Sequence, residues 1–146
     1  MKIELLEDPA LQEIEVIIRC PRTDEQVLHL LALLRADARK LTGLKEGETF
    51  LLNTGDILYI DTVDKRVFLY TEEEVYETPL KLYELLERLE PMDFFRAGKS
   101  TIINFRQIQS LRPEFGGRMR ATMSNGEVLY VSRQYVPAIR VKLGLT

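Results

Sequence analysis

The 146-residue sequence predicts a mainly β protein with minor α content, in which short strands form antiparallel sheets. Two observations predict this fold. From Gly43 onward, short strand-like segments are separated by turn residues, which is typical of antiparallel strands joined by turns. The pair Asn125-Gly126, with such segments on both sides, is typical of a tight hairpin turn. A content of 45% hydrophobic and 29% charged residues is enough for a folded core.

The first forty or so residues are expected to form two strands and a helix. Residues 1–6 and 13–18 alternate apolar and charged side chains, as half-buried strands do. A capping-box pattern starts at Thr23, and apolar residues then recur at helical spacing from Val27 through Ala38 to Leu41. Residues 1–43 therefore form an expected N-terminal β-β-α appendage, and residues 44–146 form the expected main domain.

The main domain is expected to consist of short strands and one short helix. In the helix, Thr78 is the expected cap, Pro79 takes the first position, and leucines from Leu82 to Leu89 line one face. The alternation near the end of the chain predicts that Arg118 and Arg120 point to solvent. The strands are expected at residues 49–52, 57–62, 66–71, 74–77, 94–96, 101–104, 108–111, 118–123 and 128–131.

Charge is distributed unevenly along the chain, whose formal net charge is −3. Residues 1–91 hold 11 basic and 20 acidic side chains, whereas residues 92–146 hold 9 basic and 3 acidic ones. The basic residues of the last third are spaced as on a folded surface. An anionic partner such as nucleic acid responds to this local field more than to the distant acidic one.

Composition argues against most enzyme classes. The single cysteine and single histidine weigh against a zinc site and against histidine-based catalysis, and no glycine-rich phosphate-binding motif occurs. We therefore expect no catalytic residues, no metal site, no cofactor and no small-molecule substrate. No segment has the length and apolarity of a membrane helix and no signal peptide is evident, so a cytoplasmic location is expected.

The last third carries a specific pattern. Phe94-Phe95-Arg96, a polar loop with Lys99 and Ser100, the strand Thr101 to Asn104, and the closing segment from Asn125 to Val136 with the letters VSRQYV follow in order. This pattern resembles the LytTR-type DNA-binding domain of bacterial transcriptional regulators, over about residues 47–143. The resemblance implies an elongated, multi-sheet antiparallel β-fold with a short helix, which reads direct repeats of double-stranded DNA by loops in successive major grooves.

The resemblance also implies the DNA-binding residues. The base-reading and phosphate-binding loops of the family correspond to Lys65 in a hairpin turn, to Lys99 with Ser100, and to Arg133 after the last strand. The neighbouring residues Arg96, Arg118 and Gln134 are candidate phosphate ligands. An arginine can bind both acceptors of a guanine edge, whereas a lysine binds a phosphate as a point charge. Taken singly, each of these cations is equally typical of a solvated surface residue.

Other interpretations stay open at this stage. Phe94, Phe95, Phe105 and Phe115 are read as core residues or as stacking platforms for single-stranded nucleic acid. The N-terminal residues are too few for a phosphoacceptor receiver domain. Their leucine-rich helix packs on its own domain, pairs with a second copy in a homodimer, or docks a membrane-bound inhibitor protein. The alternative to a DNA-binding regulator is a protein-interaction or ligand-sensing β-module without DNA affinity.

Overall fold

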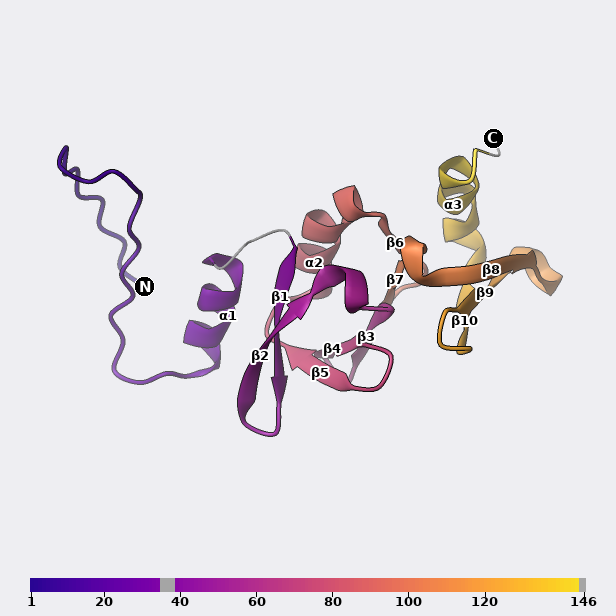
Figure 1. Ribbon diagram of the computed structural model, residues 1–146, viewed down its shortest axis with the longest axis horizontal. Helices are drawn as coiled ribbons and strands as arrows, with labels where there is room; N and C mark the ends of the chain where they lie inside the picture. The colour runs from indigo at the N-terminus through magenta and orange to yellow at the C-terminus, as the bar shows by residue number, and fades with distance from the viewer. Residues whose placement is uncertain (35–38, 145–146) are drawn as a thin grey trace.

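The computed structural model describes residues 1–34 and 39–144 (Figure 1). The α-helices in this part of the chain are α1 (Glu25–Leu34), α2 (Leu82–Leu89) and α3 (Val136–Lys142). The strands are β1 (Lys40–Lys45), β2 (Glu48–Asn53), β3 (Tyr59–Val63), β4 (Arg66–Tyr70), β5 (Val75–Thr78), β6 (Phe94–Arg96), β7 (Thr101–Asn104), β8 (Ile108–Pro113), β9 (Met119–Met123) and β10 (Val128–Val131).

The strands form two antiparallel sheets. A seven-stranded sheet has the order β2-β1-β5-β4-β3-β7-β6, and a three-stranded sheet has the order β10-β9-β8. The predicted mainly antiparallel β fold is thus confirmed. Each of the nine strands expected in the main domain is present with bounds that differ by at most two residues, because the turn residues between them mark where each strand ends.

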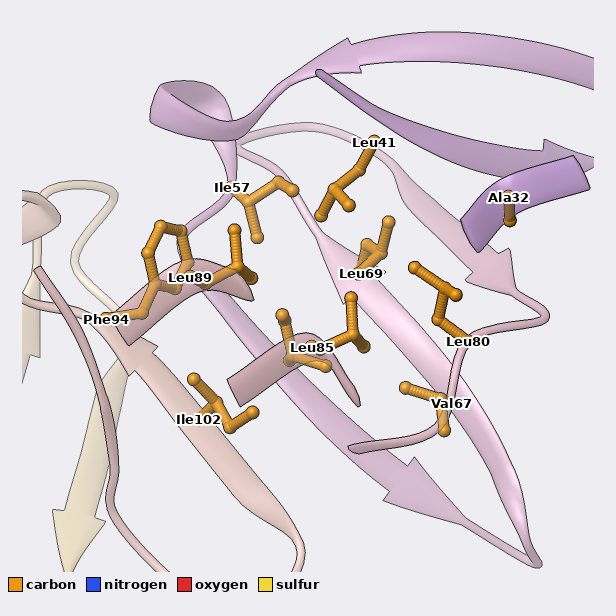
Figure 2. Packing of buried hydrophobic residues seen from close by; sticks show 11 residues of the cluster. Ala32, Leu41, Ile57, Val67, Leu69, Leu80, Leu85, Leu89, Phe94 and Ile102 are labelled. Atoms are coloured by element: carbon orange, nitrogen blue, oxygen red, sulfur yellow. The ribbon is translucent and has the colours of Figure 1, made fainter. Parts of the chain in front are cut away.

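The three strands β3, β7 and β6 are buried on both faces, so that successive residues point into two different cores. Ile60, Ile102 and Phe94 belong to a first core that α2 covers, together with Leu85 and other residues drawn in Figure 2. The adjacent residues Tyr59, Ile103 and Phe95 lie side by side in the register and face the second core. The three-stranded sheet contributes Met119, Met123 and Val131 to that second core, and α3 contributes Ile139.

The structure decides between the two readings of Phe94 and Phe95 and corrects the expectation for one arginine. Both phenylalanines are buried, as core residues are, so neither is open to stacking. Arg118 is exposed as expected, but Arg120 is half-buried because β8 lies beside β9 at that point. The hairpin between β9 and β10 does turn at Asn125-Gly126, with a positive φ at Gly126 alone.

The N-terminal helix is shorter than expected. It ends at Leu34, Ala38 lies outside the described residues, and Leu41 is in strand β1, where it pairs with Leu52 and is buried in the first core. The sequence pattern missed β1 because its leucines continue the helical spacing. Pairing with β2 across the Glu46-Gly47 turn, where both residues have positive φ, decides the conformation instead. Strand β1 runs across the domain boundary expected between residues 43 and 44.

The two strands expected at residues 1–6 and 13–18 are absent. Residues 1–24 contain neither helix nor strand, and in Figure 1 they extend away from both sheets, beyond α1. Their alternating pattern is strand-like, but a strand needs a hydrogen-bonded neighbour and an isolated two-stranded hairpin is marginal in water. The pattern alone was therefore not sufficient for the prediction.

Helix α1 packs on its own domain. Ala32 is buried in the first core with Leu33 packed against it, and Arg88 Nη1 of α2 donates to the Ala32 carbonyl at 3.3 Å. His29 Nε2 lies 2.7 Å from Glu84 Oε1. Burial raises the pKa of the Glu84 carboxyl, but hydrogen bonds from His29 and from the Lys81 backbone outweigh it and leave that pKa below its usual value. Through these contacts, the side of α1 that carries His29 and Ala32 packs against α2 and the first core.

Helix α2 begins at Leu82, three residues later than the expected first position, Pro79. The Lys81 backbone N–H donates to Glu84 Oε1 at 3.0 Å, which places the helix start there, while the Thr78 hydroxyl accepts from the Leu80 N–H in the preceding turn. Leu85 and Leu89 are buried and Leu82 and Leu86 half-buried, so the predicted apolar face is confirmed.

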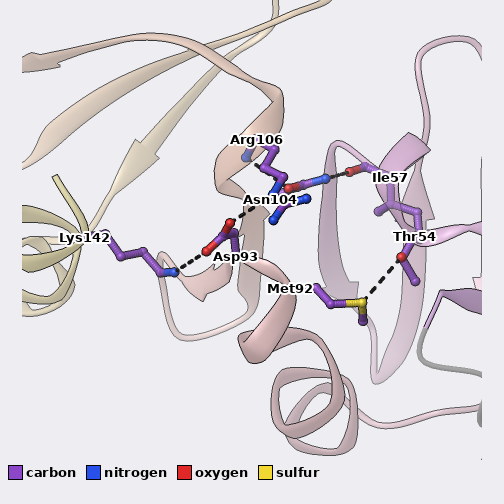
Figure 3. A network of polar contacts seen from close by, with 7 residues as sticks. All are labelled: Thr54, Ile57, Met92, Asp93, Asn104, Arg106 and Lys142. Atoms are coloured by element: carbon purple, nitrogen blue, oxygen red, sulfur yellow. Dashed lines mark hydrogen bonds and ion pairs between the residues drawn. The ribbon is translucent and has the colours of Figure 1, made fainter.

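A polar network joins the seven-stranded sheet to α3 (Figure 3). The buried Asn104 side chain donates to the Ile57 carbonyl at 2.9 Å and accepts from the Arg106 N–H. Asp93, which has a positive φ of 67°, accepts from Arg106 at 2.9 Å and from Lys142 of α3 at 3.3 Å. Helix α3 is thus fixed at its last turn to the start of β6. The sequence analysis did not predict this helix.

Candidate nucleic-acid interface

The two residues between β3 and β4 form a tight hairpin turn that presents Lys65. Asp64 and Lys65 both have positive φ, 51° and 64°, and Val63 pairs with Arg66 directly behind them. Positive φ at both central residues gives a twist that matches the flanking strands. The Lys65 side chain is exposed at the end of a rigid element, as the sequence predicted for a loop cation.

The loop between β6 and β7 presents Lys99 and is fixed from inside by Arg96. Arg96 Nε donates to the Gly98 carbonyl at 3.0 Å and Nη2 donates to the Lys99 carbonyl at 2.8 Å. The half-buried Arg96 guanidinium also lies 5.5 Å from the centre of the Tyr135 ring. With these contacts Arg96 positions the loop, whereas the Lys99 side chain is exposed at its tip.

Ser100 joins this loop to strand β3, and Lys65 lies in the turn that follows β3. The Ser100 hydroxyl donates to Asp61 Oδ1 at 3.1 Å, and the Ser100 carbonyl accepts from the Thr62 N–H at 3.0 Å. Thr101 Oγ1 donates to the same Asp61 oxygen at 3.0 Å. The Lys65 turn, three residues beyond Thr62, therefore follows the strand end that borders the Lys99 loop.

The segment after β10 is joined to the same loop by a short backbone hydrogen bond. The Ser132 N–H donates to the Ala97 carbonyl at 2.7 Å, and the Tyr135 N–H donates to the Ser132 carbonyl at 2.9 Å. Between them Arg133 and Gln134 form an exposed 3-10 turn. The loops that carry Lys99 and Arg133 are thus in direct contact.

Arg118 lies at the start of β9, next to the end of β10. Met119 pairs with Val131, and the Arg118 guanidinium lies 4.6 Å from the centre of the Tyr130 ring. The preceding residue, Gly117, is in contact with the stem of Arg133. Arg118, just before β9, and Arg133, just after β10, therefore lie at the same end of the three-stranded sheet.

We call these segments the cationic edge: residues 64–65, 96–100, 117–118 and 132–135. Within the described ranges 1–34 and 39–144, Lys65, Lys99, Arg118 and Arg133 form no ion pair with a carboxylate. Other cations of the described residues do, namely Lys2, Lys45, Arg66, Arg106, Arg112 and Lys142. The charge of these four cations is therefore not neutralised by a close ion pair, and Asp64, beside Lys65, is the carboxylate that the edge itself contains.

Sequence reasoning missed the residues that orient the edge. Asp61 anchors Ser100 and Thr101, Tyr130 and Tyr135 lie under arginines, and Gly117 adjoins Arg133. No motif marks these positions, because each contact joins segments far apart in the sequence. Phe115, grouped with the core phenylalanines, is 94% exposed beside the Gly116-Gly117 turn.

These features define the chain as a small antiparallel β-domain that presents cations on loops joined by hydrogen bonds. The family model described as LytTr DNA-binding domain matches residues 47–144, and the chain belongs to this family of DNA-binding regulator domains. The resemblance to LytTR-type domains that the sequence pattern indicated is thereby confirmed. The fold is also similar to a LytTr DNA-binding domain from Bacillus cereus, with a TM-score of 0.69 and 24% identity, covering 73% of this chain and 98% of that one.

Relatives match the chain over its whole length. Two proteins named uncharacterized HTH-type transcriptional regulators, from Staphylococcus aureus strains MSSA476 and MW2, are each 26% identical over 147 residues, which covers 99% of this chain and 99% of each relative. The match therefore includes the N-terminal residues that the family model leaves out. In the described part of this chain, none of the helices has the length and apolarity needed to cross a membrane.

Proposed function

We propose that the chain is a bacterial transcriptional regulator that binds double-stranded DNA sequence-specifically, with the loops of the cationic edge in successive major grooves of direct repeats. The observation that carries the proposal is a set of four loop cations that form no ion pair within residues 1–34 and 39–144 and lie on segments joined by hydrogen bonds: Lys65, Lys99, Arg118 and Arg133. Backbone hydrogen bonds hold these segments in place, so that little conformational freedom is lost on binding.

The proposed roles follow from the chemistry of each side chain. The exposed Arg133 presents a planar fork that fits O6 and N7 of a guanine, a contact worth about 1–3 kcal/mol of discrimination. Lys99 at the loop tip and Lys65 at the hairpin turn bind phosphates or base-edge acceptors, and Arg118 and Gln134 bind phosphates. Arg96 and Ser100 act mainly through loop position, since their polar groups are bonded within the protein.

The N-terminal residues 1–43 are proposed to be the regulatory part, through a homodimer or through a membrane-bound inhibitor protein. The regulator would act in the cytoplasm, where bacterial DNA lies. This proposal is supported by relatives named as transcriptional regulators that match this segment too. It requires no catalytic residue, metal or cofactor.

Fluorescence anisotropy with labelled duplexes that carry direct repeats tests the DNA proposal. If about five phosphates are bound, the logarithm of the association constant falls against the logarithm of the salt concentration with a slope of about −4 to −5. Selection of bound duplexes from a random pool then supplies the operator. Weak binding to the duplexes, with an association constant that does not change with salt, would instead favour the protein-interaction or ligand-sensing module.

A further inference from the structure

The three-stranded sheet has one face in the second core and one face open to solvent. Met119, Ala121 and Met123 of β9 are buried in the core, so the residues that alternate with them point to the other side. The strand register adds residues of β8 and β10 to that side. No element within residues 1–34 and 39–144 covers it at Arg112 and Tyr130, which are exposed. We call it the outer sheet face: Arg112, Arg118, Arg120, Thr122 and Tyr130.

Arg120 is the central residue of this face. It lies directly opposite Arg112 of β8 and directly opposite Tyr130 of β10, and like charges in opposite positions destabilise a sheet. Arg112 Nη2 pairs with Glu114 Oε1 at 3.1 Å, whereas the Arg120 side chain forms no ion pair among residues 1–34 and 39–144. Its Nε is buried without a hydrogen-bond partner there. The fold therefore holds a guanidinium whose charge and Nε donor are left unpaired, which is unfavourable unless an anion binds.

Arg118 connects the outer sheet face to the cationic edge. Its backbone is extended and it stands two residues before Arg120, so both side chains leave the same side of the sheet. The Arg118 guanidinium lies 4.6 Å from the centre of the Tyr130 ring. Arg118 is also part of the cationic edge, beside the segment that carries Arg133. The two surfaces are therefore continuous, and a row of phosphates bound at Arg118 extends towards Arg120.

Charge and chemistry favour a phosphate backbone as the occupant of this face. The face carries three arginines, and among the described residues Glu114 supplies the one carboxylate that is ion-paired to them. A guanidinium donates to phosphate oxygens through a planar fork, and the hydroxyl of Tyr130 is a further donor. An acidic protein would be attracted by the same charges. Continuity with the cationic edge, which is proposed to bind DNA, favours DNA over such a protein.

We propose that the outer sheet face binds the DNA backbone next to the segment that the cationic edge contacts, with Arg120 as a phosphate ligand. This inference rests on the proposed function and extends the DNA-binding surface from the loops to the sheet. The DNA that one chain covers is then longer than the loops alone require. Because the added contacts are made to phosphates, they raise affinity without adding base preference.

Duplex length separates the sheet contact from the loop contacts. Anisotropy is measured with one repeat of the selected operator in a duplex of about one helical turn, ~10 base pairs, and with the same repeat flanked on both sides to ~30 base pairs. Wild type should bind the longer duplex more tightly. Arg120→Gln should lose about fivefold in affinity for the longer duplex, with a salt slope lower by about 0.9, and should bind the short duplex like the wild type. Arg140→Gln is the matched control, because Arg140 is exposed on α3, away from the outer sheet face, and forms no ion pair within residues 1–34 and 39–144.

The Nε–H group of Arg120 allows a second measurement that needs no variant. Because Arg120 Nε is buried, its proton is shielded from exchange with water and should give a resolved signal in a nitrogen–proton NMR spectrum. That signal should shift when the longer duplex is added and stay in place with the short one. The wild-type chain therefore tests the contact even if Arg120→Gln fails to fold.

Three results would overturn the proposal. They are wild-type affinity of Arg120→Gln for the longer duplex, an Arg120 Nε–H signal that this duplex leaves in place, and a larger shift with polyglutamate than with DNA, which would indicate an acidic protein as the partner. Failure of the proposed function has a different result: the wild-type chain then binds neither duplex, which overturns both proposals. If Arg133→Ala loses base preference while Arg120→Gln changes nothing, the loops bind DNA and the outer sheet face does not.

Discussion

The stem of Arg133 lies against the backbone of Gly117: a Cβ on Gly117 would be 2.9 Å from Cγ and Cδ of Arg133. Gly117 also has a φ of +80°, a conformation that disfavours residues with a Cβ. The glycine therefore serves two purposes, because it forms the turn before β9 and leaves room for the side chain proposed to read a base. The direction of Arg133 depends on a residue sixteen positions earlier.

Gly117→Ala should displace the Arg133 side chain and strain the turn. We expect a loss of about 1–2 kcal/mol in the free energy of unfolding, from the positive φ. We also expect a loss of sequence discrimination close to that of Arg133→Ala. The measurements are urea unfolding and anisotropy with matched and mismatched duplexes. In the double variant Gly117→Ala/Arg133→Ala, discrimination should be no worse than in Arg133→Ala alone, and additive losses would contradict the link.

Arg118→Ala and Arg133→Ala should have different effects on DNA binding, the first on overall affinity and the second on base preference. Loss of a phosphate ligand at Arg118 should weaken all sequences alike and reduce the salt slope by about 0.9, whereas loss of Arg133 should cost about 1–3 kcal/mol of preference for one base pair. Anisotropy titrations across salt, with specific and random duplexes, separate the two effects. Arg106→Ala is the control, because Arg106 is paired with Asp93 and follows the far end of β7. Equal behaviour of all three variants would contradict the assignment of the edge.

Asp61 offers a test of loop position without a change in any DNA-facing side chain. Its Oδ1 accepts hydrogen bonds from Ser100 and Thr101 and from the Thr62 N–H. Asp61→Asn removes a negative charge near the edge and retains an oxygen acceptor, so it should bind DNA as tightly as the wild type or a few-fold more tightly. Asp61→Ala removes the charge and the anchor together, and should bind more weakly than Asp61→Asn.

The difference between these two variants isolates the anchor. Backbone order parameters from NMR relaxation should fall for residues 97–100 in Asp61→Ala and stay near the wild-type values in Asp61→Asn. If both variants bind equally and have equal order parameters, the Asp61 contacts do not position the loop.

The sequence predicted most of the fold because turn residues separate the main-domain strands and the last hairpin alternates visibly, as in Met119 to Met123. It failed where pairing partners decide the conformation. Leu41 continues a helical pattern and yet forms a strand because β2 lies beside it. Residues 1–18 have a strand pattern but pair with no strand among residues 1–34 and 39–144. Local periodicity carries no information about such long-range partners.

The same reason limits the prediction of the site. The cations Lys65, Lys99 and Arg133 were recognised through the family pattern, and the structure brings their segments together. The inward direction of Arg96 and the anchoring by Asp61 depend on side-chain contacts across loops, for example from Arg96 to the Lys99 carbonyl. Such contacts follow from three-dimensional register rather than from spacing along the chain.

Asp93→Asn should reduce the acid sensitivity of the fold. Hydrogen bonds from Arg106 and Lys142 lower the pKa of the Asp93 carboxyl below its ordinary 3.8. A lowered folded-state pKa means that the contribution to stability is present above the unfolded pKa and is lost as pH falls from about 4 through the folded value. Asparagine tolerates the positive φ at this position and keeps an acceptor oxygen, so the change removes mainly the charge.

Urea unfolding of wild type and Asp93→Asn between pH 7 and pH 2 measures this effect. The variant should be less stable than the wild type at pH 7, and the two curves should converge as the pH falls below 4, because the wild-type carboxyl is then protonated. Lys142→Met, which removes one partner of the carboxyl, should show a smaller loss at pH 7 and the same convergence. Parallel curves over the whole range would show that the Asp93 charge does not link α3 to the start of β6.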